Sequence, residues 1–275
     1  MLTRTFCHIP GVGAQSEQRL WDAGVRSWGD ALSCELSGRR GDVIRAAAEQ
    51  SIERHQQRDA RYFAAHLPPR EHWRLFREYS DSVAYLDIET TGLGMPNDHV
   101  TTIALYDTRR VRHYVHGVNL EQFERDVAAY DLIVTYNGKS FDLPFLRKFL
   151  RVDVDVAHID LMHVLRSIGH SGGLKAIEQR LGYSRTDMAD IDGYFAVVLW
   201  HEYERTGDAR VLETLLAYNV QDVLTLESLM ALAFNTKLRA TPFADELTVP
   251  MPHVASNPFR AHREVVDRLK RQSYW

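Results

Sequence analysis

The sequence predicts an α/β fold, in which a mixed sheet of three antiparallel strands followed by parallel strands is flanked by helices. A small α-helical region is expected before the sheet. Two observations carry this prediction: apolar, β-favouring runs first follow one another across short turns, and later alternate with helical segments. The length of 275 residues, with 45% hydrophobic and 25% charged residues, is typical of a globular chain with one large and one smaller domain.

Residues 1–75 are expected to form the small helical region. Residues 9–13 (Ile-Pro-Gly-Val-Gly) make a tight turn that opens onto a helical segment, and Gly24 stands where that helix should end. The turn resembles a helix-hairpin-helix element, whose glycines let backbone N–H groups approach a nucleic-acid phosphate. A helical corner that only packs is the alternative. A polar helix is expected over 41–66, and Pro68-Pro69 should end it and mark a linker.

Residues 80–235 carry the sheet. The expected strands, in chain order, run from Val83 to the acids that follow it, then over 100–106, 111–118, 132–136 and 158–161. The expected helices lie over 119–130, 140–150, 174–181, 194–203 and 208–235. This order of strands and helices matches the ribonuclease-H-like fold. Trp73, Phe76 and Tyr79, spaced by three, are expected to pack as they lead into the sheet.

The first strand ends in two acids, Asp87 and Glu89. Side chains alternate along a strand, so these two should project from the same face. Adjacent carboxylates repel each other and are costly to desolvate, and a bound cation offsets both costs. Oxygen-rich sites of this kind suit Mg²⁺ or Mn²⁺ rather than zinc. The alternative is a pair of solvated acids that cap the turn after the strand.

Two later segments could bring further acids to the same place. Asp142 lies in the first turn of a helix directly after a buried strand, which would deliver it to the sheet edge where Asp87 lies. Alternatively, it is an acid favoured only by the helix macrodipole. Tyr218 and Asp222 are four residues apart on a helix, hence neighbours on one face. The apolar residues that should place this helix against the core are Leu215, Leu216, Val223 and Leu226.

In this order, the segments 87–93, 136–142 and 218–222 resemble the three motifs of the DnaQ-like (DEDD) 3′–5′ exonuclease superfamily. The Tyr-x-x-x-Asp form of the third segment resembles the DEDDy branch, and Ala217 stands where the other branch would need histidine. Residues 172–178 and 194–200 also look like those of bacterial YprB-like ribonuclease-H-like proteins. The resemblance covers about residues 80–235.

The resemblance implies metal-dependent hydrolysis from a 3′ end that releases nucleoside 5′-monophosphates. Two divalent ions, Mg²⁺ or Mn²⁺, would clamp the attacking and leaving oxygens. Asp87 would bridge the ions, while Glu89 and Asp222 hold one and Asp142 serves the other. Tyr218 would orient the attacking water, because a phenol with a pKa near 10 is a poor base. The side chains that would line the pocket of the terminal nucleotide are Thr90, Thr91 and Leu93, with Asn137 and Phe141 as further candidates.

Residues 169–173 (Gly-His-Ser-Gly-Gly) fit the G-x-S-x-G pattern of a serine hydrolase, which requires a buried strand before the serine. The sequence of residues 162–168 fits a helix at least as well as a strand. We therefore expect residues 169–173 to form a loop that caps the next helix and contacts phosphate through its N–H groups and Lys175. The other hypothesis for the whole chain is a non-catalytic nucleic-acid-binding module that uses the helix-hairpin-helix element, with the acids as a relic.

The expected partner is nucleic acid, with single-stranded DNA favoured and RNA possible, because no motif reads a 2′-hydroxyl. The net charge of −4 does not by itself suggest such a partner, and the sequence does not fix the oligomeric state. Cys7 and Cys34 should be reduced, and no signal peptide or membrane helix is expected, which favours the cytoplasm. In the C-terminal extension, 236–275, the mixture of basic and aromatic residues from Asn257 onward could bind single strands or dock on the domain.

Overall fold

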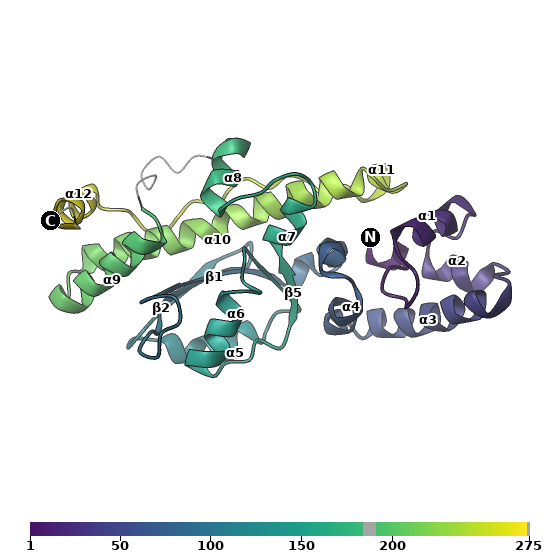
Figure 1. Ribbon diagram of the computed structural model, residues 1–275, viewed down its shortest axis with the longest axis horizontal. Coiled ribbons are helices and arrows are strands. Elements are labelled where there is room, and N and C mark those ends of the chain that lie inside the picture. The colour runs from purple at the N-terminus through teal and green to yellow at the C-terminus, as the bar shows by residue number, and fades with distance from the viewer. Residues whose placement is uncertain (184–190, 274–275) are drawn as a thin grey trace.

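The structure, a computed structural model, describes residues 1–183 and 191–273. Its centre is a five-stranded sheet with the strand order β3-β2-β1-β4-β5 (Figure 1). β1 pairs antiparallel with β2, and β2 with β3, whereas β1 and β4, and β4 and β5, pair in parallel. This confirms the predicted mixed α/β sheet. The strands are β1 Val83–Thr90, β2 Val100–Tyr106, β3 Val111–Val115, β4 Leu132–Thr135 and β5 Ala157–Asp160.

Helices cover both faces of the sheet. The long helix α10 (Ala209–Leu238) crosses one face, and the short helices α5 (Phe123–Val127) and α6 (Asp142–Phe145) lie on the other (Figure 1). Tyr85 of β1 belongs to the hydrophobic cluster that includes α10, while Leu86 belongs to the cluster on the opposite face. Because side chains alternate along a strand, Asp87 and Glu89 continue the α10-facing set.

The N-terminal region is helical, as predicted, but its polar stretch is not one helix. The expected helix over 41–66 is wrong as a single element, because the chain turns at Arg58, whose φ is 55°. Asp59 then caps the next helix by accepting a hydrogen bond from the Tyr62 N–H at 3.0 Å. The helices of this region are α1 Ala14–Asp22, α2 Trp28–Ser33, α3 Gly38–Gln56 and α4 Ala60–His66.

The segment after Pro68 is a packed connection rather than an open linker. It forms the 3₁₀ helix η2 (Pro69–Leu75), and the predicted packing of Trp73, Phe76 and Tyr79 is confirmed, since all three are buried. Trp73 and Phe76 belong to one hydrophobic cluster that also includes residues of the N-terminal helices and of α10. The N-terminal region and the sheet therefore share a core, and the proposed domain boundaries stay predictions.

Three other predicted elements differ in extent. β3 ends at Val115 rather than at 118, because the Asn119 side chain accepts a hydrogen bond from the Val115 N–H at 2.8 Å and starts the turn. The helix expected over 119–130 is a 3₁₀ turn, η4 (Leu120–Gln122), followed by α5. The helix expected over 140–150 begins at Asp142 and continues beyond α6 as a π-helical turn, η5 (Leu146–Leu150).

The remaining elements complete the helical layers. Ser171 follows a helix, α7, rather than a strand, so the strand that a serine-hydrolase elbow requires does not precede it. These elements are α7 Leu161–Arg166, α8 Leu174–Leu181, α9 Gly193–Thr206, α11 Ala244–Leu247 and α12 Arg263–Ser273, with the 3₁₀ turns η1 Leu2–Arg4 and η3 Ser80–Ser82.

The C-terminal extension docks on the domain. Val265, Val266 and Leu269 of α12 are buried in a cluster with residues of α9 and α10. The two aromatic residues at 274–275 lie outside the described residues, so their predicted role stays a prediction. Cys7 and Cys34 are free. Across the described ranges, no helix combines the length and the apolar character needed to cross a membrane, and the cytoplasmic location stays a prediction.

Candidate metal and active site

Three of the four predicted carboxylates converge in space. One ligand oxygen from each of Asp87, Glu89 and Asp222 lies within 4.8 Å of the other two. Glu89 and Asp222 are buried and Asp87 is half-buried. The arrangement follows from local structure: β1 directs its two acids toward α10, and α10 carries Asp222. A compact set of carboxylate oxygens is the donor set that suits a hard divalent cation, so these residues fit Mg²⁺ or Mn²⁺.

The electrostatics of Asp87 point the same way. Burial raises the pKa of Asp87 well above its usual value, and the charges of Asp222, Glu89 and Asp142 raise it further. A hydrogen bond from Asn219 opposes this rise in the pKa. A cation bound among the carboxylates would offset the repulsion that adds to the rise in this pKa.

Asp142 lies beside this group but not within it. It is the first residue of α6, is only 4% exposed, and is not among the three carboxylates that meet within 4.8 Å. Burial raises the pKa of Asp142 to about 7, against hydrogen bonds with the backbone of Asp142 and Ile88, and the charges of Asp160 and Asp222 add to the rise. The structure therefore brings Asp142 into electrostatic reach of the other acids.

The loop that leads into Asp142 is organised by Asp160, which the sequence analysis did not single out. Asp160, at the end of β5, accepts hydrogen bonds from the backbone N–H groups of Asn137 (2.9 Å), Lys139 (3.1 Å) and Met162 (3.1 Å). Asn137 adopts a left-handed conformation, with φ at 65°. At Gly138, a Cβ atom would lie 2.2 Å from Thr135 Oγ1, so the tight turn requires glycine. The available signal was an acid ending a strand parallel to β4.

Tyr218 lies on α10 one turn before Asp222 and is 6% exposed. The ammonium nitrogen of Lys175, from α8, lies 4.9 Å from the centre of the Tyr218 ring. α8 is held against α10 through its buried Glu178, which accepts a hydrogen bond from the Thr225 hydroxyl. Lys175, predicted as a phosphate contact, thus lies next to the candidate tyrosine.

Asn219 is the second polar residue of the site that the sequence did not single out. It is fully buried, and its amide nitrogen donates to Asp87 Oδ2 at 2.7 Å and to the Asp87 backbone oxygen at 3.3 Å. Its amide oxygen accepts a hydrogen bond from the Thr102 hydroxyl at 3.0 Å. The signal in the sequence was a polar residue between Tyr218 and Val220, next to the residues of the third motif.

Of the predicted nucleotide-pocket residues, Thr90 ends β1, and Thr91 and Leu93 lie in the loop between β1 and β2. Thr90 and Thr91 are used within this loop: the Thr90 hydroxyl donates to the Gly92 oxygen at 2.6 Å, and the Thr91 hydroxyl accepts from the His99 N–H at 2.9 Å. Leu93 is 92% exposed. These contacts hold the loop so that Leu93 projects into solvent.

The other candidate pocket residues lie around α6. Phe141 precedes Asp142, is half-buried, and packs against Phe145 at a ring-centroid distance of 5.5 Å. Lys148, in the π-helical turn, donates to the Gly94 backbone oxygen at 2.9 Å and so ties this turn to the β1–β2 loop. Asn137, also half-buried, lies in the loop before α6.

A family model described as the RNase_H superfamily matches residues 84–234, which carry all of the sheet except Val83 and all the candidate acids. The chain belongs to the RNase H superfamily. Among its relatives, the uncharacterized protein YprB of Bacillus subtilis (strain 168) is 30% identical over 175 residues. That alignment covers 54% of this chain and 41% of YprB, so the chain spans less than half the length of this relative.

Two solved structures are similar to this RNase H superfamily chain at lower identity. The Brucella melitensis protein NrnC bound to pGG is 18% identical, with a TM-score of 0.41, over 62% of this chain and 80% of NrnC. The family B DNA polymerase of the archaeon Pyrobaculum calidifontis is 22% identical, with a TM-score of 0.43, over 57% of this chain and 24% of the polymerase. Similarities at these TM-scores carry no functional conclusion for this chain.

Proposed function

We propose that the protein is a divalent-metal-dependent 3′–5′ exonuclease that hydrolyses phosphodiester bonds of nucleic acid to nucleoside 5′-monophosphates. Single-stranded DNA is the favoured substrate and RNA is a possible one. The observation that carries the proposal is the convergence of Asp87, Glu89 and Asp222 within 4.8 Å, on the α10 side of the sheet and one helical turn from Tyr218.

In this proposal the four acids hold the metal. Asp87, Glu89 and Asp222 would bind one divalent cation, Mg²⁺ or Mn²⁺, and Asp142 would help to hold a second. Bound there, the cations would supply positive charge to the scissile phosphate and increase the acidity of the attacking water. Tyr218 would orient this water through its hydroxyl, since an ordinary phenol is a weak base near neutral pH.

The substrate would be placed by residues around the acids. Lys175, with its ammonium nitrogen 4.9 Å from the Tyr218 ring, would pair with a phosphate near the 3′ end. The exposed side chain of Leu93 would pack against the terminal base, and Thr90 and Thr91 would keep the loop in the shape that presents it. Phe141 and Asn137, both half-buried beside Asp142, are further candidates for contacts with the terminal nucleotide.

The helix-hairpin-helix-like turn would make a second contact with the nucleic-acid backbone. Gly11 has φ at 80°, and α1 begins after Gly13, which offers no side-chain cap to the helix N–H groups. Arg40 donates to the Gly11 oxygen at 3.2 Å and to the Ser16 hydroxyl at 2.8 Å, which places a guanidinium on the hairpin. An open depression of about 570 Å³ borders the turn. This element also supports the alternative, a non-catalytic nucleic-acid-binding module.

A degradation assay tests the proposal. Purified protein is mixed with 5′-labelled DNA and RNA oligonucleotides of matched sequence, in Mg²⁺, in Mn²⁺ or in EDTA, and one set carries a blocked 3′ end. We expect metal-dependent shortening from the free 3′ end and no shortening in EDTA or with the blocked end.

Each other outcome has a definite meaning. Intact oligonucleotides in both metals would contradict the nuclease, and binding without turnover would support the non-catalytic module. Cleavage of the oligonucleotides with a blocked 3′ end would keep a nuclease but contradict the requirement for a free 3′ end. The ratio of DNA to RNA rates identifies the preferred substrate.

A further inference from the structure

One buried amide connects the helix that carries Tyr218 and Asp222 to the strand that carries Asp87. Asn219 is 0% exposed, and both contacts of its amide nitrogen, at 2.7 and 3.3 Å, are with Asp87. Its amide oxygen accepts a hydrogen bond from the hydroxyl of Thr102, which lies on β2, the strand paired with β1. All the hydrogen-bonding groups of this side-chain amide therefore have partners on two adjacent strands.

These contacts restrict Asp87 in two ways. The bond to Oδ2 occupies one of its two carboxylate oxygens and so limits rotation of the carboxylate, while the bond to the backbone oxygen ties the strand itself. The Thr102 hydroxyl donates to the Asn219 amide oxygen, and this fixes which end of the amide faces Asp87. Because Asn219 lies in the same helical turn as Tyr218 and Asp222, the same amide also fixes the distance between α10 and β1.

The chemistry of the amide suits a position beside a cation. Asn219 donates hydrogen bonds without a positive charge, so it can hold a carboxylate without competing with a metal for it. A leucine of similar volume would leave two polar partners, the half-buried Asp87 and the buried Thr102, without this contact.

We infer that Asn219 is a positioning residue of the proposed metal site, which orients the carboxylate of Asp87 and sets α10 so that Asp222 reaches the same cation. The inference rests on the proposed function. Asn219 acts through Asp87, and it does not itself contact substrate in this assignment.

The test compares Asn219→Leu and Thr102→Val with Asn235→Leu, a matched control on the same helix. The Asn235 side chain makes hydrogen bonds with the backbone of Val249 in the C-terminal extension, and its amide nitrogen also contacts the Met251 sulfur at 3.9 Å. For each full-length variant, calorimetry gives the Mn²⁺ dissociation constant, and oligonucleotide assays over a Mg²⁺ series give kcat and KM. Thermal unfolding in EDTA measures stability separately.

We expect Asn219→Leu to weaken Mn²⁺ binding by about 10- to 100-fold, as is typical for groups that orient a ligand. At saturating Mg²⁺, kcat should fall while KM for the oligonucleotide stays within about twofold, because substrate contacts are intact. Thr102→Val should change metal binding in the same direction but less, and the double variant should be no worse than Asn219→Leu alone. Asn235→Leu should change the melting temperature only.

Unchanged Mn²⁺ affinity and kcat in a folded Asn219→Leu protein would overturn the inference while leaving the nuclease intact. If that variant does not fold, Thr102→Val decides, and wild-type metal affinity in it overturns the inference. If the wild type binds Mn²⁺ but hydrolyses nothing, the proposed function fails, and the role of Asn219 is judged by metal affinity alone. Absence of Mn²⁺ binding to the wild type would contradict both.

Discussion

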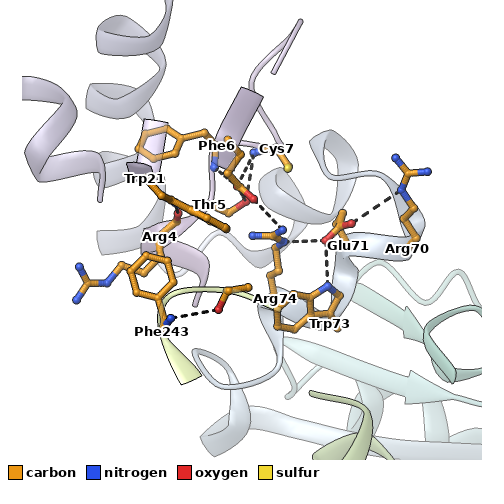
Figure 2. A network of polar contacts seen from close by, with 12 residues as sticks. Arg4, Thr5, Phe6, Cys7, Trp21, Arg70, Glu71, Trp73, Arg74 and Phe243 are labelled. Carbon is orange, nitrogen blue, oxygen red and sulfur yellow. Dashed lines mark hydrogen bonds and ion pairs between the residues drawn. The ribbon is translucent and has the colours of Figure 1, made fainter. Parts of the chain in front are cut away.

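Among the described residues, two groups of buried acidic side chains have opposite surroundings. In the N-terminal region, Arg74 lies between two acids. Its Nε is 2.9 Å from Glu71 Oε2 (Figure 2), and its Nη2 is 2.8 Å from Glu17 Oε2. At the candidate metal site, by contrast, the carboxylates of Asp87 and its neighbours face one another.

The N-terminal acids are also supplied with neutral donors. Glu17 accepts hydrogen bonds from the Thr5 hydroxyl at 2.6 Å and from the N–H groups of Phe6 at 2.7 Å and Cys7 at 3.2 Å. Trp73 donates its indole N–H to Glu71 at 3.0 Å. Figure 2 shows that these contacts join the first residues of the chain to the 3₁₀ segment that leads into the sheet. This network anchors the N-terminal region.

The contrast appears in the titration of the two groups. Burial alone would raise the pKa of Glu71, but the charge and hydrogen bonds of Arg74 lower it below its usual value. Burial and neighbouring carboxylates together raise the pKa of Asp87. A buried acid matched by a guanidinium contributes to the fold, whereas a buried acid whose neighbouring charges are other acids is suited to a cation from solution.

The largest expected effect is on activity. Asp87→Ala should reduce hydrolysis by more than about 10³-fold, because it removes the central metal ligand. In EDTA the variant should be as stable as the wild type or more so, since the repulsion is relieved. Initial rates in Mg²⁺ and urea unfolding in EDTA measure the two quantities. Asp81→Ala, which changes an exposed acid outside the site, is the control for the rate. An Asp87→Ala rate within tenfold of wild type would contradict the assignment of Asp87 as the central metal ligand.

Arg74→Met should have the reverse profile. It leaves Glu17 and Glu71 buried without their counter-charge, which should cost about 3–5 kcal/mol of unfolding free energy. The protein that remains folded should keep its Mn²⁺ affinity. Urea unfolding at neutral pH and calorimetry check both, and a loss below about 1 kcal/mol would show that this network does not anchor the region.

Low pH should lower the stability of the fold through protonation of His8 in the N-terminal region. Burial lowers the pKa of His8 to about 4, and the charges of His66 and Arg74 lower it further. The unfolded chain therefore binds this proton first, so stability is complete above about pH 6.5 and falls as the pH drops toward 4, by up to about 3 kcal/mol. His8→Phe should remove this part of the pH dependence, as measured by urea midpoints at pH 7 and pH 4.5. Parallel pH profiles would contradict it.

Tyr218→Phe should have the smallest effect, a fall in kcat of about tenfold, because the ring and its contact with Lys175 remain while the hydroxyl is lost. Stability should change little. Single-turnover rates over a pH series separate this loss from changes in binding. If Tyr218→Phe and Asp87→Ala reduced the rate equally and only slightly, the assignment of both residues would be wrong.

The sequence predicted those parts of the site that depend on short spacings. Asp87 and Glu89 are two apart on a strand, and Tyr218 and Asp222 are four apart on a helix, so their shared faces follow from local geometry. It did not predict the role of Asn219, because the partners Asp87 and Thr102 lie 132 and 117 residues away along the chain.

The break between α3 and α4 has a similar explanation. Asp59 favours the start of a helix after Arg58, but no proline or glycine near Arg58 marks the turn itself in the sequence. The Arg58 guanidinium donates to Asp81 and Asp131, each at 2.8 Å, and these partners lie next to β1 and β4. The left-handed conformation is therefore stabilised by contacts that arise only when the N-terminal region has docked on the sheet.

The most direct test of the central claim is a crystal structure of the wild type grown with Mn²⁺, with anomalous scattering recorded to locate the metal. The account predicts an anomalous peak bound by carboxylate oxygens of Asp87, Glu89 and Asp222. A fully saturated crystal with no peak among these three residues, or with Mn²⁺ bound only elsewhere, would contradict it.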